Sequence, residues 1–135
     1  MPASPLKATA KFEMPGWDEQ SIVEYSGGRK LTHAQVKKSF TGDLVGTSVL
    51  EYLMVYPPEP PVPYVGVEYF EGTFLGKRGS FALTITGTYD GQAREQATII
   101  AGSGTGELAQ LRGSWNFGAG HEDKVAGFEI EYWWG

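Results

Sequence analysis

The sequence predicts an all-β protein, a single antiparallel closed barrel of about eight strands that spans residues 1–135. Three observations predict this class. Apolar and polar residues alternate with a period of two along most of the chain, whereas the 3.6-residue period of a helix is nearly absent. Turn signals separate the alternating segments at near-regular spacing. The 19 glycines and an aromatic content of 13% suit a barrel, because glycine permits strand curvature and large rings fill the interior.

Eight segments carry the alternation that is typical of strands. They are residues 6–13, 31–41, 46–56, 64–75, 80–89, 92–101, 114–117 and 125–134. In the first segment Ala8, Ala10 and Phe12 share one face and polar residues share the other, which predicts a half-buried strand. In the last segment, aromatic and aliphatic residues alternate with glutamates in the same way.

Clusters of glycine, proline and charged residues predict the connections. These are residues 14–28, 42–43, 57–63, 76–79, 90–91, 102–113 and 118–124. Asp90-Gly91 is a strong hairpin signal. The segment PPEPPVP, from Pro57 to Pro63, lacks most of the amide donors that a sheet requires. It predicts a stiff, extended connector, and a lid over the barrel mouth is the alternative.

Composition argues against several classes of function. The chain has no cysteine, which excludes disulfides, thiolate metal sites and a cysteine nucleophile. A net charge of −5 and the lack of a basic stripe argue against a nucleic-acid partner. No segment approaches the ~20 apolar residues of a membrane helix, and the N-terminus has no signal-peptide core. We therefore expect no membrane partner and a cytoplasmic location.

No metal site and no cofactor are predicted. The GSGTG sequence at residues 102–106 resembles a dinucleotide-binding loop, but no long helix follows it. The two histidines, His33 and His121, lie in no recognised catalytic or zinc motif. The sequence thus directs attention to the barrel interior rather than to a bound group.

Two charged residues interrupt faces that are otherwise apolar. Lys38 shares a strand face with Ala34, Val36 and Phe40, and Glu68 shares one with aromatic residues and glycines. Both side chains should therefore point into the barrel. An unpaired buried charge costs several kcal/mol, so we expect the two to pair across the narrow lumen. Their pairing is either purely structural or the polar anchor of a ligand pocket.

The segment at residues 46–56 is apolar on both faces, unlike the other strands. A strand with two apolar faces is covered on both sides, and in a barrel the outer cover comes from a loop or another subunit. The chain also ends in Trp133 and Trp134 before a final glycine. Because large exposed apolar patches usually mark interfaces, we expect a homodimer or a higher homo-oligomer.

Several segments resemble a bacterial family of unknown function, number 3224. They read TGDLVGTSVLEYLMVY (41–56), YVGVEYFEGTF (64–74), GSFALTITGTY (79–89) and GSGTGELAQLRG (102–113). FEMPGWDEQ and KLTHAQVKKSFTGDL are similar to its opening segments, so the resemblance covers nearly the whole chain in order. It implies a barrel similar to allene oxide cyclases and dirigent proteins, which steer cyclisation of largely apolar molecules and commonly form dimers or trimers.

The resemblance implies no specific reaction, because the family has no generally assigned activity. This chain also departs from the pattern, since it carries Thr84-Ile85 where relatives tend to have Gln-His, and Tyr69 where they often have Arg. Roles of those family residues therefore do not transfer.

The function expected from these features is binding of a small, mainly apolar molecule in the lumen, with an isomerase- or cyclase-type acid–base step as the reaction class. Glu68 would be the acid–base group or polar anchor, and Lys38 would set its charge. The pocket would be shaped by aromatic residues, namely Tyr52, Tyr56, Tyr64, Phe70, Phe74 and Trp115. A non-enzymatic carrier or stress-related binding protein, and a barrel that is simply filled, are the alternatives.

Overall fold

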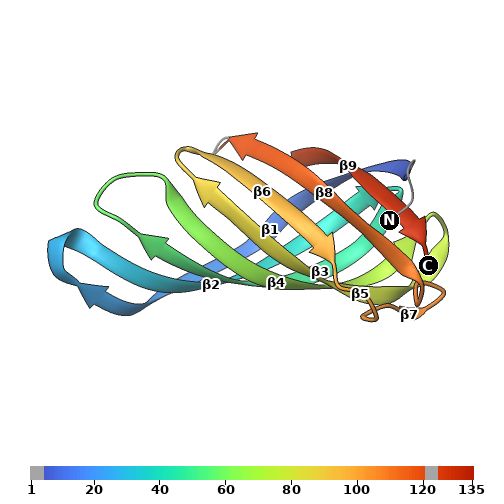
Figure 1. The fold of residues 1–135 in the computed structure, drawn as a ribbon, viewed down its shortest axis with the longest axis horizontal. Helices are drawn as coiled ribbons and strands as arrows, with labels where there is room; N and C mark the ends of the chain where they lie inside the picture. The colour runs from blue at the N-terminus through green and yellow to red at the C-terminus, as the bar shows by residue number, and fades with distance from the viewer. Residues whose placement is uncertain (1–4, 121–124) are drawn as a thin grey trace.

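The computed structural model describes residues 5–120 and 125–135. This part of the chain consists almost entirely of β-strands, with one short 3-10 helix and no α-helix (Figure 1). The elements are β1 (Leu6–Tyr25), η1 (Ser26–Gly28), β2 (Arg29–Gly42), β3 (Leu44–Tyr56), β4 (Val62–Phe74), β5 (Lys77–Tyr89), β6 (Gln92–Ile99), β7 (Thr105–Gly106), β8 (Leu111–Gly120) and β9 (Val125–Trp134). The predicted all-β class is therefore confirmed.

Eight strands form a closed ring in which every neighbouring pair is antiparallel. The order around the ring is β1, β2, β3, β4, β5, β6, β8, β9 and back to β1. The two-residue β7 pairs only with β5. Most consecutive strands are ring neighbours because the connections between them are short. The first and last long strands, β1 and β9, close the ring side by side, with Leu6 paired to Tyr132 (Figure 1).

The predicted connection at residues 14–28 is wrong for most of its length. β1 continues through it to Tyr25 and remains paired with β2. The pairing register shifts twice, first between Glu13 and Gly16, as expected for a β-bulge. No side chain of β1 beyond Phe12 is buried, so this half of the strand has no apolar face and produces no alternation in the sequence.

Several other boundaries differ from the prediction. β8 has ten residues, from Leu111 to Gly120, where the sequence predicted only residues 114–117. Residues 118–120 of the predicted polar loop belong to β8, and 121–124 lie outside the described residues. The proline-rich connector is shorter than predicted, because Val62 and Pro63 already belong to β4. These strand ends carry glycine or proline, which the sequence rules assign to turns.

The interior of the ring is filled largely by aromatic side chains. One group, here called the aromatic cluster, consists of Phe12, Phe40, Phe70, Phe81, Trp115 and Phe128. Neighbouring ring centroids in it lie 4.9–6.1 Å apart, the spacing of packed aromatic pairs. All six side chains are buried, and all come from the strand faces that point into the ring.

Phe70 packs directly onto backbone because two glycines face each other beneath its ring. Gly46 of β3 and Gly72 of β4 are paired and have φ angles of +154° and +156°. A Cβ atom at either glycine would lie 3.0 Å from Phe70 Cζ and about 2 Å from a carbonyl oxygen of the paired strand. Only glycine fits both the backbone conformation and the space.

Candidate interior site

The structure brings the two predicted charged residues together inside the ring. Lys38 on β2 is 2% exposed, and Glu68 on β4 is completely buried. Lys38 Nζ lies 3.7 Å from Glu68 Oε1. The Lys38 ammonium group also lies 4.3 Å from the centroid of the Phe12 ring, a favourable cation–π distance.

A second carboxylate, which sequence reasoning missed, completes this group. Glu95 on β6 is buried, and its Oε2 lies 3.7 Å from Lys38 Nζ. We refer to Lys38, Glu68 and Glu95 as the charge cluster. Glu95 shares the inward face of β6 with Ala97 and Ile99, and that i, i+2, i+4 spacing is the signal that could have identified it. The surrounding sequence, QAREQATI, is too polar for the alternation to stand out.

One oxygen of each carboxylate accepts hydrogen bonds from hydroxyl groups. Ser48 Oγ donates to Glu68 Oε2, while the hydroxyls of Tyr52 and Tyr64 donate to Glu95 Oε1 over 2.8 and 2.9 Å. The other two oxygens, Glu68 Oε1 and Glu95 Oε2, are buried and accept no hydrogen bond from the described part of the chain. Their 3.7 Å distances to Lys38 Nζ are those of ion pairs rather than hydrogen bonds.

The charge cluster is not balanced when all three groups are ionised. Two carboxylates and one ammonium group carry one net negative charge in an apolar interior. An uncompensated buried charge is costly, so the arrangement favours a ligand that donates hydrogen bonds. The geometry is therefore suited to exchanging a proton with a bound molecule.

Tyr52 and Tyr64 act as hydrogen-bond donors because they stay protonated. Burial, followed by the negative charge of Glu95, raises the pKa of Tyr52 well above its usual value. The same two causes raise the pKa of Tyr64. Both phenols therefore donate to Glu95 throughout the neutral range.

Two glycines make room for these tyrosines. A Cβ atom at Gly66 would lie 2.8 Å from Cδ1 of Tyr52, and one at Gly87 would lie 2.6 Å from both Cζ and the hydroxyl oxygen of Tyr64. Each glycine is the cross-strand partner of the tyrosine that covers it. The glycines within these strands thus mark the positions at which the aromatic ring of a tyrosine lies against the backbone of the neighbouring strand.

The remaining predicted pocket residues do not all reach the charge cluster. Phe70 and Trp115 are buried in the aromatic cluster, on the interior side of their strands. Phe74 lies in a separate group, with ring centroids 4.9 Å from Tyr132 and 6.4 Å from Trp134. The sequence could assign these side chains to the inner face of the sheet but not to a height along the axis of the ring.

Tyr56 belongs to a different hydrogen-bonded group, which is only partly buried. Its hydroxyl and that of Thr32 both donate to Glu19 Oε2 over 2.6 Å. Burial acts to raise the pKa of Glu19, but hydrogen bonds from Thr32, Tyr56 and Trp17 outweigh it and lower that pKa. Burial, together with the hydrogen bond to Glu19 and its charge, raises the pKa of Tyr56 to about 12.

We expect this raised pKa to appear in the stability of the protein at high pH. The contribution of Tyr56 is complete below its unfolded-state pKa of 10.0 and is lost as pH rises through about 12. The free energy of unfolding of a Tyr56→Phe variant should therefore fall less steeply between pH 10 and 12 than that of the wild type. Denaturant titrations at several pH values measure both slopes, and equal slopes would contradict this assignment.

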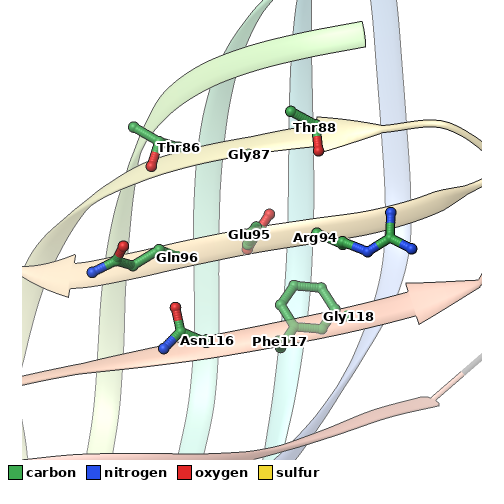
Figure 2. A pocket seen from close by; sticks show the side chains of 9 residues that line it. All are labelled: Thr86, Gly87, Thr88, Arg94, Glu95, Gln96, Asn116, Phe117 and Gly118. Carbon is green, nitrogen blue, oxygen red and sulfur yellow. The ribbon is translucent and has the colours of Figure 1, made fainter. Parts of the chain in front are cut away.

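Glu95 also lines a surface pocket of about 700 Å³ (Figure 2). It is lined by three neighbouring strands, with Thr86, Gly87 and Thr88 of β5, Arg94, Glu95 and Gln96 of β6, and Asn116, Phe117 and Gly118 of β8. Glu95 and Phe117 are cross-strand partners, and both also lie near Lys38, whose Nζ is 5.9 Å from the Phe117 ring centroid. Glu95 therefore belongs both to the pocket lining and to the charge cluster, and Phe117 lies beside it.

The structure also bears on membranes and metals. No helix among residues 5–120 and 125–135 is long and apolar enough to cross a membrane. In the same described ranges, no three His, Asp or Glu side chains are grouped so that they could hold a metal ion.

Comparisons with known proteins show the family but no activity. No curated protein matches the sequence. A solved protein of unknown function from the DUF3224 family of Shewanella oneidensis MR-1 is similar in structure, with a TM-score of 0.80 and 25% sequence identity. The match covers 98% of this chain and 99% of the other. The similarity to allene oxide cyclases and dirigent proteins stays a prediction. The model of the family described as "Protein of unknown function (DUF3224)" matches residues 8–132, and the chain therefore belongs to the DUF3224 family.

Proposed function

We propose that this protein binds a small, mainly apolar molecule inside its ring and performs on it an acid–base step of the isomerase or cyclase type. One observation carries the proposal. Glu68 Oε1 and Glu95 Oε2 are buried acceptors without a donor from the described chain, and both face the same ammonium group. A ligand hydroxyl, enol or N–H group placed there would satisfy an acceptor that otherwise costs free energy.

The two carboxylates have different roles in this proposal. Glu95 accepts two phenol hydrogen bonds and serves as the counter-ion of Lys38. Glu68 accepts one hydroxyl hydrogen bond, from Ser48, and its Oε1 is the atom that takes or gives the proton. Lys38 stabilises negative charge that develops on the ligand as the proton moves.

The surface pocket supplies the route to this site. Phe117 is only partly buried and packs edge-on against Phe12, 5.0 Å between centroids. Rotation of the Phe117 side chain would connect the pocket to the charge cluster, because Glu95 lines both.

We also assign the ring to the closed barrels of the allene oxide cyclase and dirigent type, and the protein to the cytoplasm, on the sequence features given above.

The filled barrel is the competing function, and the aromatic cluster favours it. Six packed aromatic side chains occupy the ring beside Lys38 and Glu68, as expected for a structural core. A carrier without turnover would use the same acceptors as the enzyme, so binding and turnover must be measured separately.

We expect N-phenyl-1-naphthylamine, an apolar fluorophore with one N–H donor, to bind saturably with one site per chain. Glu68→Gln should weaken binding roughly fivefold to tenfold, because glutamine keeps only a neutral acceptor and a hydrogen bond to a charged group is about 1–1.5 kcal/mol stronger. Glu51→Gln is the matched control, since Glu51 is an exposed carboxylate on β3. Fluorescence titration measures all three affinities.

Absence of saturable binding to the wild type would refute the proposal in favour of a filled ring. Equal affinities of the wild type and Glu68→Gln would show that the charge cluster is not the binding site. If binding is saturable and depends on Glu68, conversion of candidate substrates then separates an enzyme from a carrier.

A further inference from the structure

Seven large apolar side chains lie together on the outer surface of two neighbouring strands. This outer patch consists of Val45, Val49, Leu53 and Val55 of β3 and Val65, Val67 and Tyr69 of β4. Each of them is 40–53% exposed. Cross-strand pairing joins Leu53 to Val65 and Val49 to Tyr69, so the patch is continuous across both strands. The predicted strand at residues 46–56, which is apolar on both faces, corresponds to the β3 part of this patch, and the outer face of β4 contributes the rest.

The seven side chains of the outer patch carry no charge, although the chain has a net charge of −5. Two exposed carboxylates lie on the same outer faces, Glu51 between Val49 and Leu53 on β3 and Glu71 two residues after Tyr69 on β4. The Glu51 carboxylate is 3.1 Å from His33 Nε2 and accepts a hydrogen bond from Gln35 over 3.2 Å. Both partners lie on β2, at the margin of the patch. The seven uncharged side chains thus let two copies approach with less repulsion than the charged remainder of the surface would impose.

The area of the outer patch fits an interface between two chains of this size. Half-exposed valine, leucine and tyrosine side chains together offer roughly 350–450 Å² of apolar surface. Apolar area makes up about 56–65% of an interface, so the whole contact would bury roughly 600–800 Å² per chain. A standard stable interface buries about 800 Å² per partner.

We propose that this protein forms a homodimer in which the outer faces of β3 and β4 from two chains pack against each other. The two sheets would lie about 10 Å apart, as in a β-sandwich, with the outer patches interdigitated. The Trp134 ring packs against Phe74 and Tyr132 of its own chain, and the proposed interface does not require it. The dimer is independent of the interior site and of the proposed reaction.

Light scattering coupled to gel filtration tests the dimer directly. At micromolar concentration the wild type should have twice the 14.7 kDa mass of one chain. Val67→Lys, which places a charge in the middle of the outer patch, should give the monomer mass with an unchanged circular dichroism spectrum. Thr98→Lys is the matched control, because Thr98 is an exposed position on β6, outside the patch, and this variant should remain dimeric. A monomeric wild type, or a dimeric Val67→Lys variant, would overturn the proposal.

The absence of cysteine allows a second measurement that does not depend on disrupting the interface. A nitroxide attached to a Leu53→Cys variant should show a strong dipolar coupling between two chains in pulsed electron paramagnetic resonance. The same label on a Thr98→Cys variant should report a longer distance. If the β6 label gives the shorter distance, the interface lies elsewhere on the ring and the proposal fails.

Discussion

Lys38→Met is expected to destabilise the protein by about 3–5 kcal/mol, because it leaves two buried carboxylates without their cation. The lysine is 2% exposed, so water does not replace it. Lys37→Met is the control, since Lys37 is the exposed neighbour on the same strand. Denaturant unfolding at neutral pH should show a small effect for the control, within about 0.5 kcal/mol.

Neutralising the carboxylates as well should recover much of that loss. The triple variant Lys38→Met, Glu68→Gln, Glu95→Gln retains acceptors for Ser48, Tyr52 and Tyr64 but holds no buried charge. Its free energy of unfolding should exceed that of Lys38→Met alone, which is the non-additivity expected of one coupled group. Additive effects of the three single substitutions would show that the groups do not act together.

Phe70→Ala is expected to cost about 3–5 kcal/mol, the usual range for removing a buried phenylalanine. Phe70 is 1% exposed, and its ring centroid lies 5.6 Å from that of Phe40 and 4.9 Å from that of Phe81. The backbone of Gly46 and Gly72 packs beneath it and leaves little freedom to collapse into the space.

Two further variants make the Phe70 experiment selective. Phe70→Leu should cost less than Phe70→Ala, because it leaves a smaller cavity. Tyr69→Ala alters the adjacent residue, which points outward and is 50% exposed, and should have a smaller effect than Phe70→Ala. A loss below about 1.5 kcal/mol for Phe70→Ala would mean that the ring interior is poorly packed there.

The fold could be predicted because the chain alternates wherever one face of a strand is buried. In β9, Phe128, Ile130 and Tyr132 are all buried, and the predicted strand at 125–134 matches the observed bounds. The alternation rule did not predict the second half of β1, and the reason is physical. Its pairing with β2 is made by backbone hydrogen bonds, and neither of its faces is buried. The side chains therefore show no alternation of apolar and polar residues that would indicate a strand.

The candidate site was predictable only where a charge interrupts an apolar face. Lys38 and Glu68 satisfy that condition, and the structure places their charged groups together. Glu95 also shares its face with apolar residues, Ala97 and Ile99, but the polar residues of the other face make the short strand read as polar throughout, so the interruption was missed. The alternation pattern also could not predict how far along the axis of the ring a side chain lies. Phe74 shares a strand face with Glu68 but packs against Tyr132, because alternation specifies the face of a strand and not its depth.

A crystal structure of the protein with N-phenyl-1-naphthylamine would test most directly whether the charge cluster is a ligand site. We predict that the probe lies inside the ring, with its N–H group within hydrogen-bond distance of Glu68 Oε1 or Glu95 Oε2. Density for the probe only on the outer surface, or an unchanged interior in crystals saturated with it, would contradict the account and leave Lys38, Glu68 and Glu95 as a structural group.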